Sequence, residues 1–166
     1  MKAARVIFGG ILILFLAVVI YPARAQPPSG HLSDDQITGA PLNGNDRSVV
    51  VLIHGWTNED PPNAPGNSFA GGDWPQLVNA LRARLNGSGW KLLLFHWEED
   101  ASTGRAIDFS DPIQGNLFGL PGFANARNAA ANAFLNGAPL ADSLHQSAPD
   151  LRKVVFVAHS AGSWVA

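Results

Sequence analysis

A serine stands in a segment of small residues near the end of the chain, directly after a short apolar run. The segment reads Ala158-His159-Ser160-Ala161-Gly162 and follows the run VVFV. It fits the pattern G-x-S-x-G with alanine in place of the first glycine, and this pattern is typical of a serine on a sharp turn between a strand and a helix. Ala158 and Gly162 suit such a turn, because its strained backbone leaves little room for side chains. The segment therefore indicates Ser160 as a nucleophile.

A second segment could supply the electrostatic help that a serine nucleophile needs. His54-Gly55-Trp56 ends an earlier apolar run. We expect the backbone N–H groups of Trp56 and Ala161 to form an oxyanion hole, in which each donor contributes on the order of 3 kcal/mol. His54 is expected to fix the backbone of Gly55 and its neighbours by a hydrogen bond, whereas His159 is expected to pack beneath the serine turn.

Three apolar runs, at 48–53, 90–97 and 153–157, predict the strands that position these segments. Each run is short, lacks a polar break in its core and is rich in Val, Leu or Phe, which indicates a strand buried on both faces. Helical patterns separate the runs. Strands that alternate with helices predict a parallel sheet with crossover connections and an α/β fold.

The clearest helix signal begins at Asp73, a predicted N-cap, with Gln76 three residues later as the partner of a capping box. Apolar residues then recur on one helical face and the pattern ends at Gly87; they are Trp74, Leu77, Val78, Leu81 and Leu85.

The second half of the chain is less regular. Residues 98–122 show no sustained period and predict a long loop, which is typical of a lid or binding element. Its first residues, Glu98-Glu99-Asp100, are expected to be solvated. A helix is predicted at 123–135, a stop at Asn136-Gly137, and a second helix at 139–147.

The N-terminus has the pattern of an export signal. Lys2 and Arg5 precede an uncharged apolar run, and Ala23-Arg24-Ala25 matches a cleavage site. The predicted organisation is a signal peptide at 1–25, a leader rich in Pro, Gly and Ser at 26–47, and one domain from 48 to 166. An uncleaved membrane anchor is the alternative, although the apolar run is shorter than the roughly 20 residues that span a bilayer.

Composition excludes several classes of protein. The 166 residues are 46% hydrophobic and only 14% charged, which argues against disorder. Without residues 1–25 the chain has eight basic and thirteen acidic residues, about −5 in formal charge, so a nucleic-acid partner is not expected. Cysteine is absent, and the five histidines lack zinc-ligand spacing, so no metal site is predicted.

Four segments together resemble the successive landmarks of α/β-hydrolases: V-V-V-L-I-H-G-W, D-W-P-Q-L, L-L-L-F-H-W and V-V-F-V-A-H-S-A-G-S-W. Their order and spacing are most similar to the pancreatic-lipase-like branch, over about residues 48–166. The resemblance implies the α/β-hydrolase fold, a parallel sheet with flanking helices. It places Ser160 on the nucleophile, and Trp56 and Ala161 on the oxyanion donors. Ala158 and the long 98–122 stretch depart from the family pattern.

The resemblance also implies an activity. It predicts an exported lipase or esterase that cleaves small-molecule or lipid carboxylic esters through an acyl-enzyme, without a cofactor and with transient contact with lipid surfaces. In this fold the triad acid and histidine follow the serine, yet only six residues follow Ser160. We therefore expect both groups in an absent C-terminal part, and a nearly inactive fragment as printed.

Two other interpretations stay open. The same serine turn serves amidases and peptidases, and nothing in the residues separates the leaving groups. A protein of another class, an inactive truncated or non-catalytic hydrolase-like binding protein, would keep the turn without the chemistry.

Overall fold

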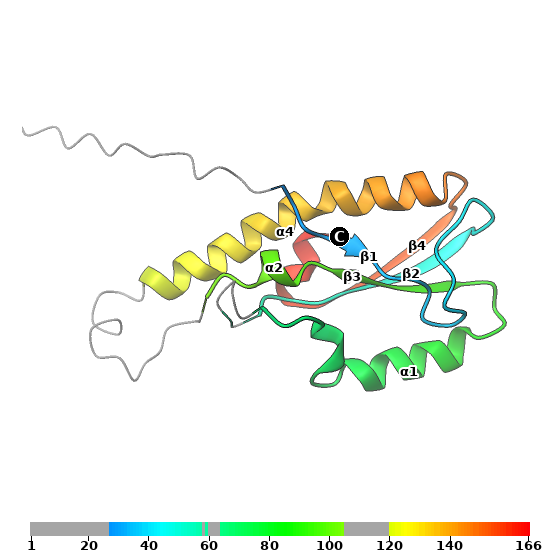
Figure 1. The fold of residues 1–166 in the computed structure, drawn as a ribbon, viewed down its shortest axis with the longest axis horizontal. Coiled ribbons are helices and arrows are strands. Elements are labelled where there is room, and N and C mark those ends of the chain that lie inside the picture. The colour runs from blue at the N-terminus through cyan, green and yellow to red at the C-terminus, as the bar shows by residue number, and fades with distance from the viewer. Residues whose placement is uncertain (1–26, 58, 60–63, 105–119) are drawn as a thin grey trace, which may run out of the picture.

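The centre of the protein is a four-stranded sheet in the order β1–β3–β2–β4 (Figure 1). The computed structural model describes residues 27–57, 59, 64–104 and 120–166. Three strands run parallel, β2 (Ser48–Ile53), β3 (Lys91–His96) and β4 (Lys153–Ala158). The predicted α/β class and all three predicted strands are confirmed, each strand to within one residue at either end.

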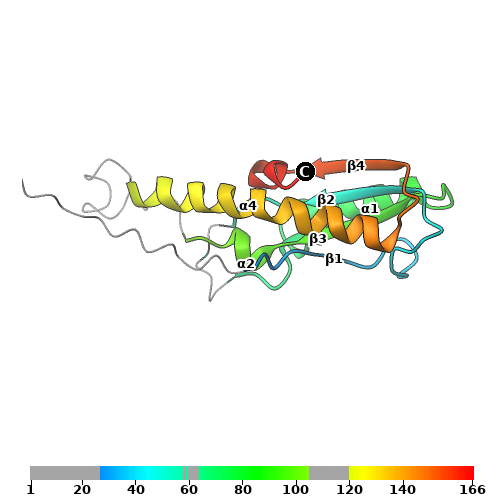
Figure 2. The ribbon, with the colours of Figure 1, turned by 90° about the horizontal axis from the view of Figure 1, so that it is seen from above.

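The two faces of β2 are covered by different helices. Its odd-numbered side chains pack in one core cluster with Leu140 and Leu144 of α4 (Leu120–Ser147). Its even-numbered side chains pack in another with Val78 of α1 (Trp74–Leu85). Figure 1 shows α4 and α1 on opposite sides of the sheet, and Figure 2 shows α4 lying along the strands. Burial on both faces explains why the run SVVVLI is apolar at every position after the serine.

α1 has the predicted bounds, but its first turn differs from the prediction. Asp73 occupies the N-cap position, but its side chain makes no hydrogen bond to the helix. The predicted capping box with Gln76 is therefore wrong. Its backbone is already helical, with φ −88° and ψ −2°, whereas a capping side chain usually starts from an extended backbone. Of the predicted apolar face, Leu77 is 36% exposed and the other members are buried or partly buried against the sheet.

α4 is one helix where the sequence predicts two. Asn136 is buried inside it, and its side chain accepts a hydrogen bond from Gly30 N at 2.9 Å and donates to Asp100 Oδ2 at 2.9 Å. A β-carbon on Gly137 would lie 3.0 Å from the carbonyl oxygen of Val165. Both residues therefore make tertiary contacts. These contacts stabilise a continuous helix across the predicted stop at Asn136-Gly137 and across Pro139.

β4 is an exposed strand, which corrects the prediction of a third buried strand. It pairs with β2 along its whole length, from Lys153 opposite Ser48 to Ala158 opposite Ile53. In the part of the chain that the structure describes, no strand pairs with its other edge. Val154, Val155 and Phe156 consequently remain 38–44% exposed.

The segment predicted as a leader contributes to the sheet. It contains β1 (His31–Leu32), which pairs antiparallel with β3. Asp35 then turns the chain: it is 1% exposed and accepts hydrogen bonds from Leu92 N at 2.8 Å and from the backbone and hydroxyl of Thr38. Burial alone would raise the pKa of Asp35, but the hydrogen bonds from Leu92, Thr38 and Ile37 outweigh it and lower the pKa.

Two predictions fall largely on other parts of the chain. The signal peptide at 1–25 lies outside the described residues, as does most of the long loop, 105–119. The first residues of the predicted loop form a short helix, α2 (Glu98–Ala101), and its last residues belong to α4, which begins at Leu120. The predicted loop bounds, 98 and 122, are therefore wrong at both ends. No helix among the described residues is long and apolar enough to cross a membrane.

Replacing Asp35 with alanine should destabilise the protein, because the buried N–H of Leu92 and the Thr38 donors lose their acceptor. We expect the free energy of unfolding to fall by about 3 kcal/mol at pH 7, measured by urea unfolding. Since the pKa is lowered on folding, this difference should be complete above about pH 5 and shrink as the pH falls below the unfolded pKa of about 4. Asp34→Ala, at the exposed neighbouring position, is the control and should change stability little.

Candidate active site

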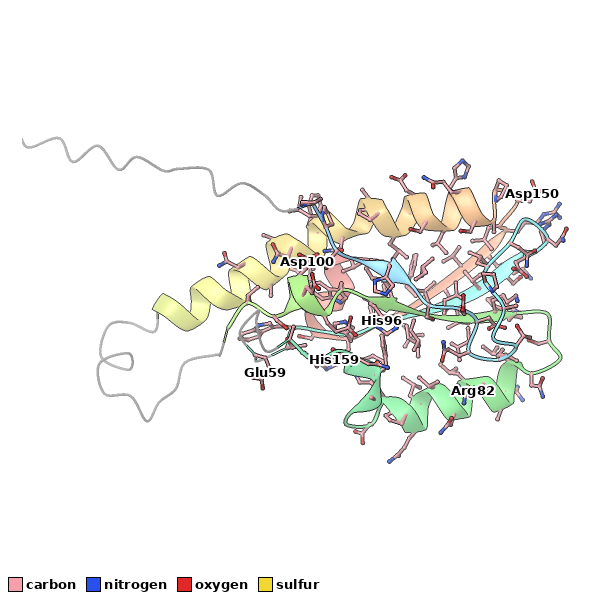
Figure 3. The ribbon with its side chains drawn as sticks, viewed as in Figure 1. Glu59, Arg82, His96, Asp100, Asp150 and His159 are labelled. Carbon is pink, nitrogen blue, oxygen red and sulfur yellow. The ribbon has the colours of Figure 1, made fainter. Side chains whose placement is uncertain are left out.

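The predicted site segments all lie at the carboxyl ends of the three parallel strands. β2 leads into His54 and Gly55, β3 leads into Trp97 and Glu98, and β4 leads into the serine turn. The carboxyl ends of parallel strands are the usual place for a site in an open α/β sheet. In Figure 3 the labels of His96, the last residue of β3, and His159, the residue after β4, mark this end of the sheet.

Ser160 has the backbone conformation that a sharp strand-to-helix turn demands. Its φ is +52°, and it is the one non-glycine residue with positive φ in the described part of the chain. Such a conformation costs on the order of 1 kcal/mol, which the surroundings must offset. The turn is held by hydrogen bonds from His159 N to Ile53 O at 3.0 Å and from Gly162 N to His159 O at 2.9 Å. Ser160–Trp164 forms a 3₁₀ helix, η3, rather than the start of the predicted α-helix.

Two glycines let the serine turn touch the end of β2. A β-carbon on Gly162 would lie 2.2 Å from His54 O and 2.9 Å from Ile53 O. A β-carbon on Gly55 would lie 2.9 Å from three atoms of the turn, Ser160 Cβ among them. Real β-carbons do not approach other atoms so closely, so both positions require glycine. The structure therefore brings the predicted oxyanion loop and the predicted nucleophile into direct contact.

His54 is buried and hydrogen-bonded to the loop that it begins. Its Nδ1 lies 2.8 Å from Gly55 O, and its own carbonyl oxygen accepts from Trp97 Nε1 at 3.0 Å. The imidazole stacks on the indole of Trp97, with ring centroids 5.4 Å apart, and meets Phe69 edge to face. The ring is thus fixed on two sides, in agreement with the predicted hydrogen bond to the loop backbone.

A crevice of about 320 Å³ lies beside the turn. Trp56, Trp74 and His159 are among the residues that line it. The indole nitrogen of Trp56 is buried and makes no hydrogen bond to the described residues. Its lining combines the aromatic side chains of Trp56 and Trp74 with polar residues, which are Thr57, Asn67 and Ser68.

His159 does not pack beneath the turn, so that prediction is wrong. Its side chain lies at an exposed position and meets Trp74 edge to face, with ring centroids 6.3 Å apart. The space beneath the turn is already filled by the backbone of Ile53 and His54 against Gly162. The imidazole is therefore directed into the crevice wall.

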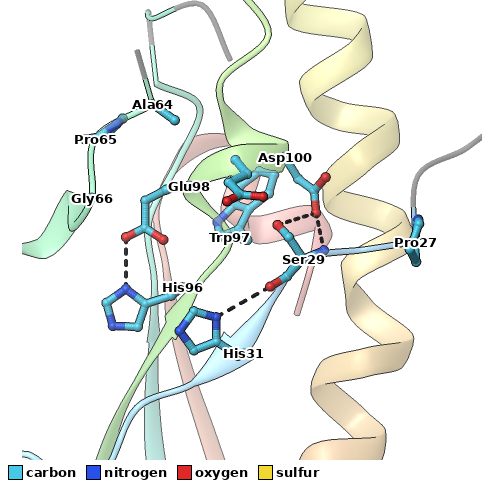
Figure 4. Close-up of a pocket in the computed structure, with 11 residues that line it drawn as sticks. Pro27, Ser29, His31, Ala64, Pro65, Gly66, His96, Trp97, Glu98 and Asp100 are labelled. Atoms are coloured by element: carbon cyan, nitrogen blue, oxygen red, sulfur yellow. Dashed lines mark hydrogen bonds and ion pairs between the residues drawn. The ribbon is translucent and has the colours of Figure 1, made fainter. Parts of the chain in front are cut away.

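Glu98 is a functional candidate that the sequence prediction missed. It was expected to be solvated, yet it is 7% exposed. Its Oε1 accepts from Ser68 N and from His96 Nδ1, both at 2.9 Å, and its Oε2 lies 3.7 Å from His54 Nε2. Figure 4 shows the bond to His96 in the wall of a cavity of about 730 Å³. Its place directly after β3, at the edge that carries the other site residues, is the signal that could have identified it.

The surroundings keep Glu98 ionised. Burial alone would raise the pKa of this carboxyl, but the interactions with His54, His96 and the Ser68 N–H outweigh it and hold the pKa well below its usual range. A buried anion consequently lies near the imidazole that begins the predicted oxyanion loop.

The described residues contain part of the groups that a serine hydrolase uses. They supply a strained serine and a neighbouring loop, but among them no side chain is hydrogen-bonded to the Ser160 hydroxyl. No group of three or more metal-binding side chains occurs within the same residues. His96 bonds to Glu98 and His145 lies exposed on α4, so neither faces the serine turn.

Comparison of the chain with models of protein families, with curated proteins and with solved structures gave no match. The assignment of this site therefore depends on the geometry of its residues.

Replacing Gly162 with alanine should destabilise the protein, because the added methyl group would overlap the carbonyl oxygens of His54 and Ile53. We expect a loss of about 3 kcal/mol in the free energy of unfolding, measured by urea unfolding. Gly44→Ala is the matched control: a β-carbon there meets no atom within 4 Å, so stability should be unchanged. Equal stability of the two variants would contradict the close contact.

Proposed function

We propose that the protein is an exported serine hydrolase of the α/β-hydrolase fold that cleaves carboxylic esters, with lipid esters as the leading substrate class. The observation that carries the proposal is the positive φ of Ser160 at the end of a parallel strand. A serine tolerates this conformation only when the surrounding contacts stabilise it, and such strain gathers at functional sites. The contact between this turn and the Gly55 loop supports the same proposal.

The proposed reaction begins when the Ser160 hydroxyl attacks the ester carbonyl. The backbone N–H groups of Trp56 and Ala161 would stabilise the oxyanion of the tetrahedral intermediate. The alcohol leaves with a proton, and an acyl-serine remains, which water then hydrolyses to the free acid. We propose that the base is a histidine outside the described residues, oriented by a carboxylate that is also outside them, as the family resemblance implies.

The proposal extends to where the protein acts. Export rests on the pattern of residues 1–25, and contact with a lipid surface on the proposed substrate class. The crevice beside the serine turn, lined in part by Trp56 and Trp74, offers aromatic surface to one arm of an apolar ester.

Ser160→Ala in the protein expressed from its complete reading frame should abolish labelling by a fluorophosphonate probe and hydrolysis of p-nitrophenyl esters, because the attacking oxygen is removed. Labelling is read on gels and confirmed by mass spectrometry of the modified peptide. The control is Ser88→Ala, in the exposed turn after α1, which should label like the unaltered protein. Undiminished labelling of the alanine variant at residue 160 would refute the nucleophile, and a correctly folded protein that never labels would favour a non-catalytic binding protein.

A further inference from the structure

Glu98 connects three segments that are separate in the sequence. Its carboxylate binds the backbone of Ser68 in η2 (Ser68–Ala70), the imidazole of His96 at the end of β3, and, at 3.7 Å, the imidazole of His54 at the end of β2. The 3.7 Å separation is too long for a hydrogen bond, so this contact is weaker than the other two. Burying a carboxylate is costly unless its oxygens are satisfied. The hydrogen bonds of Glu98 to Ser68 and His96 offset this cost and hold η2 against the end of β3.

His54 in turn fixes one peptide plane of the candidate oxyanion hole. The carbonyl oxygen of Gly55 can only accept, so His54 Nδ1 carries the proton of the 2.8 Å bond. That carbonyl belongs to the same planar unit as the N–H of Trp56, and in a trans peptide the two groups point in opposite directions. Holding the Gly55 oxygen toward the imidazole therefore determines where the Trp56 N–H points.

Glu98 acts on His54 by two routes. Directly, its Oε2 lies 3.7 Å from Nε2, the nitrogen that accepts a hydrogen bond from Trp97 N at 3.4 Å. Indirectly, it binds the N–H of Ser68, and the next residue, Phe69, packs its ring edge to face against the imidazole at 5.4 Å. Loss of the carboxylate would release the Ser68 N–H and so weaken the packing of Phe69 against the imidazole.

We propose that Glu98 is a positioning residue of the oxyanion hole, which orients the Gly55–Trp56 peptide through His54. The inference depends on the proposed serine hydrolase, because only there does the Trp56 N–H meet a developing negative charge. Glu98 does not touch substrate. Its effect should appear mainly in the transition state, where the oxyanion forms, and therefore in kcat more than in KM.

The test compares an ester with the matching thionoester, whose sulfur anion accepts hydrogen bonds more weakly. A misdirected oxyanion donor should slow the ester more than the thionoester, whereas loss of folded protein should slow both equally. The variants are Glu98→Ala and the isosteric Glu98→Gln, whose amide oxygen can still accept from Ser68 N. Glu99→Gln, at the exposed neighbouring position of α2, is the matched control.

We expect Glu98→Ala to lower kcat for the ester about 30-fold and to reduce the ratio of ester to thionoester kcat/KM by about tenfold, with KM within about twofold. Glu98→Gln, which keeps the fold if the alanine variant does not, should fall between Glu98→Ala and the unaltered protein. Glu99→Gln should match the unaltered protein.

Two results would overturn the inference in distinguishable ways. If turnover requires Ser160 but the ester-to-thionoester ratio is unchanged in both Glu98 variants, Glu98 does not position the oxyanion hole. If Ser160→Ala retains full turnover, Ser160 is not the nucleophile. The proposed serine hydrolase activity is then refuted, and so is the positioning role of Glu98.

Discussion

The end of β2 and the serine turn meet with no space for a side chain between them, and the arrangement of the site depends on this contact. The backbone oxygens of Ile53 and His54 face Gly162, while Gly55 faces Ser160 from the other side. The hydrogen bond from His159 N to Ile53 O continues the ladder between β2 and β4 by one more step. The positive φ of Ser160 can persist because this sheet register holds both ends of the turn.

The site is also electrostatically asymmetric. On the side of β3, the buried anion of Glu98 accepts hydrogen bonds from the His96 imidazole and the Ser68 N–H and lies 3.7 Å from the His54 imidazole. On the side of β4, the Ser160 hydroxyl has no side-chain partner among the described residues. The rigid half of the site is therefore the half that would bind the oxyanion, and the half that would transfer protons has its partners outside the described chain in our proposal. Preorganised donors are worth most when they do not move during the reaction.

The sequence predicts the parallel strands and the serine turn well, because these depend on local patterns. Apolar runs specify buried strands, and a helical period specifies α1. The sequence predicts poorly where a polar side chain serves a distant segment. Asn136 and Gly137 have the composition of a helix stop, yet Asn136 bonds to Gly30 and Asp100 inside a continuous helix. Glu98 and Asp35 have the composition of solvated loops, yet each accepts backbone N–H groups from segments at least 30 residues away. No local window contains the partner that decides their burial.

The position of β4 in the sheet has a consequence for local stability. β2 and β3 are each paired on both sides, whereas β4 is paired only with β2 in the part of the chain that the structure describes. Amides of β4 should therefore exchange with solvent through openings that leave β2 and β3 protected. Such an opening would carry Ser160 away from Gly55 while the rest of the sheet stays folded. In the described part of the chain, the distance between Ser160 and Gly55 therefore depends on the pairing of one strand with β2.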